Sequence, residues 1–124
     1  MIKITYFVHG TTTDNENDIS SGCKNVGLSE LGIKQSKELK DQIKDDFDVI
    51  FCSDLIRAVD STKLTFGDDQ RIKIDKRLRE CDYGDYNGKP SEVVEPICER
   101  VAERFPNGES YEDVKARIQN FWTI

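Results

Sequence analysis

The sequence predicts an α/β fold in which helices cover both faces of a mostly parallel sheet. Apolar runs typical of strands alternate with segments of helical period, in the order β-α-β-α-β-α-α. A residue with catalytic chemistry follows each strand: His9 follows the first, Arg57 the second and Glu80 the third. Because the carboxyl ends of parallel strands meet at one edge of a sheet, we expect these three side chains to converge there.

The first half of the chain is expected to hold two strand–helix pairs. Residues 2–8 are dense in β-branched and aromatic side chains, which predicts a strand buried on both faces, and the polar residues 14–27 predict a loop. A helix is expected to begin near Ser29, a suitable N-cap. Residues 48–53 form a second apolar run, and Ser53-Asp54 could cap the helix after it. The expected buried stripes are Leu31, Leu39 and Ile43 in the first helix, and Leu55, Ala58, Val59, Thr62 and Phe66 in the second.

The second half is expected to hold one strand and two helical segments. Residues 71–75 alternate charged and apolar side chains, which predicts a strand near a sheet edge, and the glycines and proline of 81–90 predict a loop. Residues 91–105 have a helical pattern that Pro96 must interrupt. Ser110 opens a capping box for a last helix. The inward residues of that helix are expected to be Val114, Ile118 and Phe121.

Size and charge argue against several classes of function. The 124 residues suit a single domain, and a net charge of −6 with a pI near 4.8 argues against nucleic acid as a partner. The chain has no apolar run of about 18 residues and no leader of the secretory type, so we expect a cytoplasmic protein without a membrane span. The cysteines form no CxxC pair, so neither a disulfide nor a zinc site is expected. They are Cys23, Cys52, Cys81 and Cys98.

His9 is the only histidine of the chain and the first candidate for chemistry. A single histidine is usually a surface residue or a hydrogen-bonded core residue, and that alternative stays open here. Its position at the end of a predicted strand, beside Gly10 and three threonines, favours a ligand site. A neutral imidazole can attack phosphorus if its other ring nitrogen is held by a carbonyl, most simply that of the Gly10 turn.

Four sequence blocks occur in order along the chain. They are His9-Gly10 with Thr12 and Asn15; Gly22 with the run 28–32 and Gln35; the run 53–58; and Leu78-Arg79-Glu80 with Gly84 and Gly88. Weaker matches follow at 108–110 and Arg117. Together they resemble the histidine phosphatase superfamily, also called phosphoglycerate-mutase-like. The resemblance covers residues 1–124 as one domain, the N-terminal portion of the family's three-layer sandwich.

The resemblance implies hydrolysis of a small phosphorylated metabolite through a phosphohistidine on His9. Arg57 would bind the phosphate, and Glu80 would protonate the leaving oxygen and then deprotonate water. Further residues expected at the substrate are Gly10, Thr12, Asn15, Gly22, Lys24 and Ser53. No cofactor or metal is expected, because arginine and histidine supply the charge. The alternatives are a solvated Arg57, a surface Glu80 and an Asn15 that only forms a turn.

The chain departs from the family pattern at three places. Val8 stands where the family has arginine, and Ile19 stands where many members have a basic residue. The chain also ends at Ile124, before a further strand that carries a second catalytic histidine in the family. We therefore expect unpaired strands, and either a fragment of a longer protein or a chain that recruits a strand from a neighbour, as in a homodimer. The 124-residue chain alone is expected to have little or no activity.

Three other functions remain to be compared with a phosphatase. A degenerate member could bind phosphorylated ligands without turning them over, as Val8 suggests. A phosphoglycerate-mutase-type phosphotransferase usually has a longer insertion than the short segment 81–110. A generic nucleotide-binding module is disfavoured, because no strand is followed by GxGxxG or GxxxxGK[ST].

Overall fold

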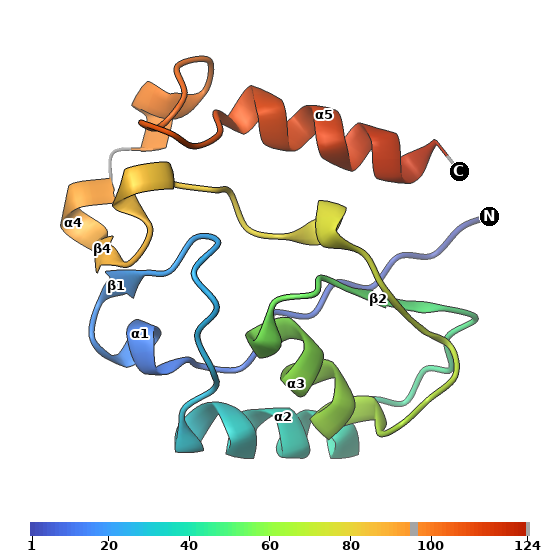
Figure 1. The fold of residues 1–124 in the computed structure, drawn as a ribbon. Coiled ribbons are helices and arrows are strands. Elements are labelled where there is room, and N and C mark those ends of the chain that lie inside the picture. Colours follow the sequence, from blue (N-terminus) through green and yellow to red (C-terminus); the bar gives the residue numbers. More distant parts are fainter. Residues whose placement is uncertain (95–96, 124) are drawn as a thin grey trace.

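The computed structural model describes residues 1–94 and 97–123, and the kink expected at Pro96 lies outside them. Helices pack around two small sheets (Figure 1). The helices are α1 (Thr13–Glu16), α2 (Glu30–Gln42), α3 (Ile56–Phe66), α4 (Ser91–Val94) and α5 (Tyr111–Trp122), with 3₁₀ turns η1 (Lys76–Leu78), η2 (Gly84–Tyr86) and η3 (Ile97–Arg100). The strands are β1 (Ile19–Ser20), β2 (Ile50–Cys52), β3 (Ile72–Ile74) and β4 (Lys89–Pro90).

The second and third predicted strands are present and pair in parallel. The register places Ile50 opposite Ile72 and Cys52 opposite Ile74, and α3 makes the crossover between them. A second sheet, which the sequence did not predict, joins β1 and β4 in antiparallel fashion inside the two predicted loops. The α/β class is therefore confirmed, but the described strands are short.

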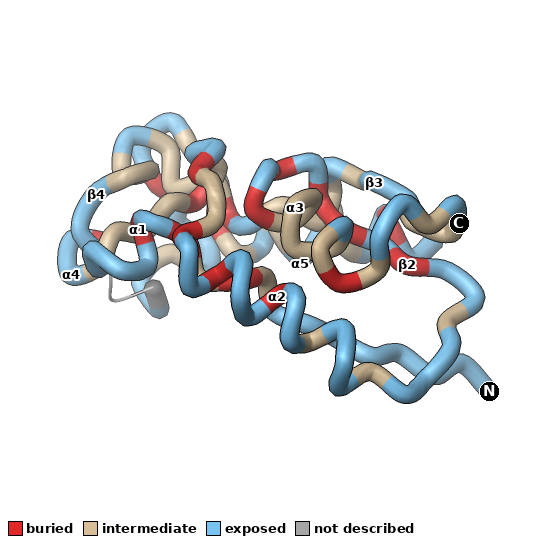
Figure 2. Tube along the Cα trace, turned by 90° about the horizontal axis from the view of Figure 1, so that it is seen from below, coloured by how far each residue is buried: buried red, intermediate tan, exposed pale blue. Residues whose placement is uncertain are grey.

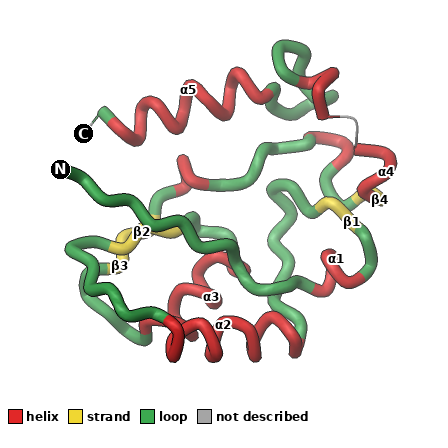
Figure 3. Tube along the Cα trace, turned by 180° about the vertical axis from the view of Figure 1, so that it is seen from behind, coloured by secondary structure: helices red, strands yellow, loops and turns green. Residues whose placement is uncertain are grey.

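The prediction of a buried strand over residues 2–8 is wrong for this structure. The segment is extended but forms no ladder within the described chain, and it passes β2 as irregular structure (Figure 3). Ile2 is 87% exposed and Val8 70% exposed. A strand needs a neighbour for its backbone N–H and C=O groups, and within the described chain residues 2–8 make no backbone–backbone hydrogen bond. Phe7 anchors the segment by edge-on contact with Phe47 and Phe66.

The expected helix α2 forms, and its buried face differs from the predicted stripe. Ser29 caps it by accepting from the Gly32 N–H, as predicted. Its buried residues, Gly32 and Ser36, lie near the first turns (Figure 2). Gly32 packs against the backbone of Thr11, whereas Leu31 of the predicted stripe is 48% exposed. The hydroxyl of Thr65 in α3 donates to the Ser36 carbonyl at 2.9 Å. A contact between two small polar residues, Ser36 and Thr65, thus joins α2 to α3.

Two further local predictions have different outcomes. The N-cap of α3 is Leu55 without a side-chain cap, so the proposed Ser53-Asp54 cap is wrong. The capping box of α5 is confirmed, because the Ser110 hydroxyl accepts from the Asp113 N–H and the Asp113 carboxylate accepts from the Ser110 N–H. Phe121 of α5 is buried, and its ring lies 5.0 Å from that of Phe51.

The remaining segments surround a small core. The segment expected to be helical over 91–105 contains only the short α4 and η3 among its described residues. Cys81, Val94 and Phe105 form the buried cluster beneath them. All four cysteines are free thiols.

No described helix combines the length and apolar character needed to cross a membrane.

Candidate active site

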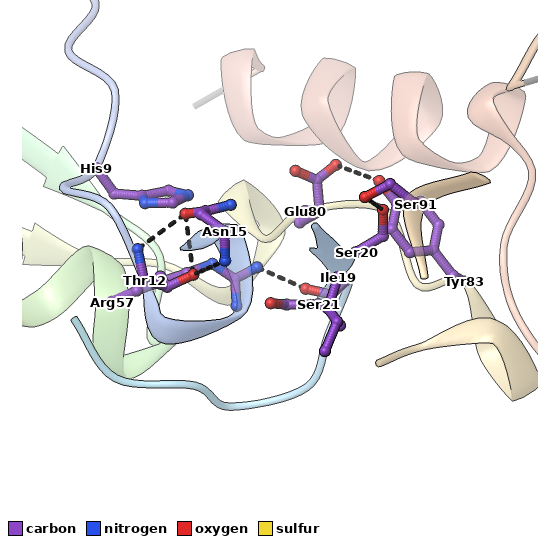
Figure 4. A pocket seen from close by; sticks show the side chains of 11 residues that line it. His9, Thr12, Asn15, Ile19, Ser20, Ser21, Arg57, Glu80, Tyr83 and Ser91 are labelled. Atoms are coloured by element: carbon purple, nitrogen blue, oxygen red, sulfur yellow. Dashed lines mark hydrogen bonds between the residues drawn. The ribbon is translucent and has the colours of Figure 1, made fainter. Parts of the chain in front are cut away.

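A cavity of about 150 Å³ lies between the loop at residue 9, β1, the start of α3 and the loop at residue 80 (Figure 4). It is lined by His9, Thr12, Asn15, Ile19, Ser20, Ser21, Gly22, Arg57, Glu80, Tyr83 and Ser91. The three predicted catalytic residues therefore converge, although they come from distant parts of the sequence. Thr12, Asn15 and Gly22 join them, as expected for substrate-binding residues.

The His9 ring is held in one tautomer by its own turn. Its Nδ1 lies 2.6 Å from the Gly10 carbonyl oxygen, and a carbonyl can only accept, so Nδ1 carries the hydrogen. This contact of Nδ1 with the Gly10 carbonyl is the one expected from the sequence. In the neutral ring it leaves the lone pair of Nε2 free. The Gly10 N–H donates to the Ser61 hydroxyl at 2.9 Å, which ties this turn to α3.

Close backbone packing explains two glycines of the motifs. A Cβ at Gly32 would overlap the carbonyl oxygen of Thr11, and a Cβ at Gly10 would overlap the carbonyl of Gly32. Ser29 reinforces the contact, because its N–H and hydroxyl both reach the Thr11 carbonyl. The loop that carries His9 therefore lies directly against the first turn of α2.

Thr12 and Asn15 form a reciprocal capping box at α1. The Thr12 N–H and hydroxyl both donate to Asn15 Oδ1 at 2.9 Å, and the Asn15 N–H donates to the Thr12 hydroxyl at 3.0 Å. The amide oxygen of Asn15 is thus engaged, while its Nδ2 remains available at the cavity. Asn15 combines the turn-forming role weighed above with a place at the pocket.

Arg57 is buried, so the alternative of a solvated arginine at a helix end is wrong. The residue is 4% exposed, and its Nη1 and Nη2 donate to the carbonyls of Lys24 and Gly22 at 2.9 and 2.6 Å. Burial lowers the pKa of the Arg57 guanidinium, and the negative charge of Glu80 opposes that shift. An arginine still carries its charge near neutral pH, and its remaining N–H donors are available to an anion in the cavity.

Glu80 is an exposed residue on the rim of the cavity. Its Oε1 accepts from the Cys81 N–H at 3.1 Å and lies 3.5 Å from the Tyr83 hydroxyl (Figure 4). The neighbouring Arg79 forms a two-pronged ion pair with Asp54, with N–O distances of 2.6 and 2.7 Å. That pair joins the loop of the fourth sequence block to the start of α3.

Arg117 and Glu109, which are among the weaker sequence matches, hold the backbone around Glu80 in place. Arg117 in α5 donates from Nη2 to the Glu80 carbonyl at 3.1 Å and from Nη1 to the Arg77 carbonyl at 2.6 Å. Its Nε and Nη2 also bind the carboxylate of Glu109. Because Glu109 accepts from the Asp82 N–H too, this ion pair fixes both ends of the Glu80 turn.

Comparison with known proteins identifies the family of the chain. The sequence profile of the histidine phosphatase superfamily (branch 1) matches residues 6–123. The chain belongs to the histidine phosphatase superfamily. The predicted family and phosphoglycerate-mutase-like fold are therefore confirmed.

Several relatives of this superfamily member carry names that describe phosphate chemistry. The fructose-2,6-bisphosphatase TIGAR of Xenopus tropicalis is 31% identical over 96% of this chain and 48% of its own length. The 2,3-bisphosphoglycerate-dependent phosphoglycerate mutase of Streptococcus uberis is 33% identical over 72% of this chain and 42% of its own. The chain thus spans about half the length of the curated relatives that it matches.

Solved structures show the same fold in other members of the superfamily. The alpha-ribazole phosphatase of Shigella flexneri superimposes with a TM-score of 0.79 at 27% identity, over 92% of this chain and 62% of that one. The mycobacterial glucosyl-3-phosphoglycerate phosphatase gives a TM-score of 0.78 at 30% identity, over the same shares of the two chains.

Three predicted substrate residues of this superfamily member lie outside the cavity lining. Gly10 contacts the His9 ring through its carbonyl oxygen, as described above. Lys24 places its ammonium 3.5 Å from the Asp14 carboxylate, and only its carbonyl serves the site, through Arg57. Ser53 is buried and accepts from the Leu55 N–H at 3.4 Å. None of the three lines the cavity, and their polar groups bond to other parts of the described chain.

Five lining residues were not predicted from the sequence. They are Ile19, Ser20, Ser21, Tyr83 and Ser91. The hydroxyls beside Gly22 were a weak signal for Ser20 and Ser21. No sequence spacing pointed to Ser91, because its contact with Ser20 joins residues 71 positions apart through the unpredicted pairing of β1 and β4. Within the described residues, no three His, Cys, Asp or Glu side chains gather closely enough to hold a metal ion.

Proposed function

We propose that this protein hydrolyses a small phosphomonoester through a phosphohistidine on His9. The observation that supports the proposal most directly is that His9, with its Nε2 free, and the buried Arg57 line the same cavity. A phosphomonoester carries close to two negative charges at neutral pH, and a permanently charged guanidinium can bind two of its oxygens at once. The cavity therefore combines a nucleophile with a phosphate-binding cation.

In the first step, Nε2 of His9 attacks phosphorus and the bond from phosphorus to the ester oxygen breaks. Glu80, in its acid form, donates its proton to the departing oxygen, and the alcohol leaves. Arg57 and the Nδ2 of Asn15 hold the equatorial phosphate oxygens, where the transition state spreads its charge. The bond from Nδ1 to Gly10 stabilises the ring while it carries the phosphoryl group.

In the second step, water attacks the phosphoryl group on the face opposite His9. The Glu80 carboxylate takes a proton from that water as the phosphorus–nitrogen bond breaks. Inorganic phosphate leaves, and both the imidazole and the acid form of Glu80 are restored. No group outside the described cavity is needed to balance the two steps.

The test is trapping of the phosphoenzyme during hydrolysis of a generic aryl phosphate. We expect an acid-labile, base-stable phosphoryl group on His9, lost in His9→Ala together with turnover. Because the chain spans about half of its curated relatives, the assay is run on the 124-residue chain and on the natural protein as expressed. Unchanged turnover in His9→Ala would contradict the proposal.

A second candidate is a member that binds phosphorylated ligands without turning them over. The cavity has Ile19 on its lining, and Val8 beside His9 is an exposed apolar residue, so neither position adds a cation. One missing charged donor can cost on the order of 10³-fold in rate. Saturable binding of inorganic phosphate that depends on Arg57, with no phosphohistidine, would favour this candidate. Transfer of the phosphoryl group to a second phosphorylated molecule instead of water would favour a mutase-type phosphotransferase.

A further inference from the structure

We propose that the cavity selects phosphomonoesters whose alcohol is uncharged and hydroxylated, and that Ser20 and Ser91 bind its hydroxyl groups. The inference rests on the proposed phosphatase function and names the substrate class for that site. It excludes esters with a second anionic group, such as a carboxylate or another phosphate. The argument combines a pair of hydroxyls, the charge of the lining and the size of the cavity.

The hydroxyls of Ser20 and Ser91 form a pair on the cavity wall. Their oxygens lie 3.0 Å apart, and both residues line the cavity (Figure 4). The pairing of β1 with β4 positions them, and the Ser91 N–H donates to the Asp18 carbonyl at 2.8 Å. Each serine hydroxyl has one hydrogen and two lone pairs, so the contact between them leaves one hydrogen and three lone pairs. Within the described chain neither hydroxyl makes another hydrogen bond, so a ligand hydroxyl can both donate and accept here.

Among the described residues, the charges of the lining match one phosphate. Among the described lining residues, Arg57 is the permanent cation, and Glu80 contributes a carboxylate. Lys24 pairs with Asp14, and Lys89, the exposed cross-strand partner of Ser20, lies outside the lining. A second anionic group would therefore lose water without gaining a counter-charge from these residues, and it would meet the Glu80 carboxylate.

The size of the cavity limits the alcohol to a few carbon atoms inside the lining. Its volume of about 150 Å³ is below the range of roughly 300–1,000 Å³ that holds drug-sized ligands. A phosphoryl group bound by Arg57 leaves room for a short polyol directed towards the two serines. Larger sugars would extend through the opening of the cavity and present only part of their hydroxyl groups to Ser20 and Ser91.

Three small esters test the inference by kcat/KM on the natural protein. Glycerol 1-phosphate has two free hydroxyls, propyl phosphate has none, and 3-phosphoglycerate replaces the terminal CH₂OH of glycerol 1-phosphate with a carboxylate. We expect glycerol 1-phosphate to exceed propyl phosphate by roughly 10-fold, the effect of one to two neutral hydrogen bonds. We expect it to exceed 3-phosphoglycerate by at least about 10-fold, because the carboxylate has no partner.

Variants of the serine pair separate the proposed contact from general effects on folding. Ser20→Ala and Ser91→Ala are each expected to lower the ratio of glycerol 1-phosphate to propyl phosphate roughly 3- to 10-fold. Ser91→Lys adds a cation to the lining and is expected to raise the ratio of 3-phosphoglycerate to glycerol 1-phosphate by about 10-fold or more. The control Lys89→Ala, at the exposed cross-strand partner of Ser20 and outside the lining, is expected to change neither ratio.

The outcomes distinguish failure of the inference from failure of the proposed function. Equal kcat/KM for glycerol 1-phosphate and propyl phosphate, with a phosphohistidine still trapped, would overturn the inference alone. Faster hydrolysis of 3-phosphoglycerate that falls in Lys89→Ala would overturn it as well, since Lys89 would then bind a second anion. No turnover of any ester and no phosphohistidine would overturn both proposals.

Discussion

The Nη2 of Arg57 donates a hydrogen bond of 2.6 Å to the carbonyl oxygen of Gly22, a residue 35 positions earlier in the chain. This contact and its neighbour to the Lys24 carbonyl connect the start of α3 to the loop that follows β1. The guanidinium therefore has a structural role on one side and a free binding edge on the other. A side chain with one donor nitrogen, such as lysine, could not hold both carbonyls and bind an anion at the same time.

Arg57→Lys is expected to lose both activity and stability. A lysine ammonium cannot reach two carbonyls and a phosphate together, so we expect kcat/KM for an aryl phosphate to fall by about 10²-fold or more. The free energy of unfolding should fall by about 1–3 kcal/mol, measured by urea denaturation, because buried carbonyls lose a charged donor. Arg104→Lys, at an exposed ion pair with Asp113, should change neither quantity appreciably. Full activity in Arg57→Lys would show that the carbonyl contacts do not orient the guanidinium.

Gly32→Ala is expected to displace the loop that carries His9. The new Cβ would overlap the Thr11 carbonyl, so the His9 loop and α2 must separate, at a cost of about 1–3 kcal/mol or more in unfolding free energy. The matched control is Gly27→Ala, where no atom beyond the adjoining residues lies within 4 Å of the added Cβ and stability should be almost unchanged. Equal melting temperatures for the two variants would refute the packing argument.

Loss of the Arg117–Glu109 pair is expected to lower kcat more than it raises KM. These residues contact the backbone of the Glu80 turn and not the cavity, so Arg117→Met or Glu109→Gln should misplace the proposed acid without removing the phosphate site. A double-mutant cycle should give a coupling energy of about 0.5–3 kcal/mol, since the two side chains share one network. Additive effects on both kcat and stability would mean that the two residues act independently.

Acid is expected to weaken the start of α5 through Asp113. The hydrogen bonds from Arg104 and the Ser110 N–H lower the pKa of Asp113 from 3.8 to about 2. A depressed pKa means that the stabilisation is complete above pH 3.8 and is lost as the pH falls towards about 2. Circular dichroism over this pH range should show a loss of helical signal in the wild-type protein. In Asp113→Asn the helical signal should change less with pH. An unchanged slope in the variant would assign the acid transition to other carboxylates, such as Asp69 and Asp75.

Thiol labelling is expected to follow burial. Cys98 is exposed, whereas Cys81 is 2% exposed and burial raises the pKa of its thiol to about 12. At pH 8 an alkylating reagent should modify Cys98 first and Cys81 only after unfolding, as peptide mass spectrometry would show. Because the folded state holds the neutral Cys81 thiol, its contribution to stability should decline as the pH rises from 9 towards about 12. Early labelling of Cys81 would mean that its loop opens in the native state.

The sequence by itself determined the features that depend on near neighbours. The caps at Ser29 and Ser110, and the bond from His9 to its own Gly10 turn, need only contacts within three residues along the chain. Such contacts form whenever the local backbone adopts the helix-cap or turn conformation, so residue type and spacing suffice to predict them. The four ordered motifs also identified the family and singled out His9, Arg57 and Glu80, which the structure places at one cavity.

Tertiary structure alone decided the features that depend on distant partners. Residues 2–8 have the composition of a strand but lack a described neighbour, and a strand cannot form without one. Lys24 faces Asp14 instead of the cavity, and Ser91 reaches Ser20 across 71 residues through a pairing that no local pattern indicates. Propensity describes what a segment can form, whereas its partners in space decide whether it forms and which side chains line the site.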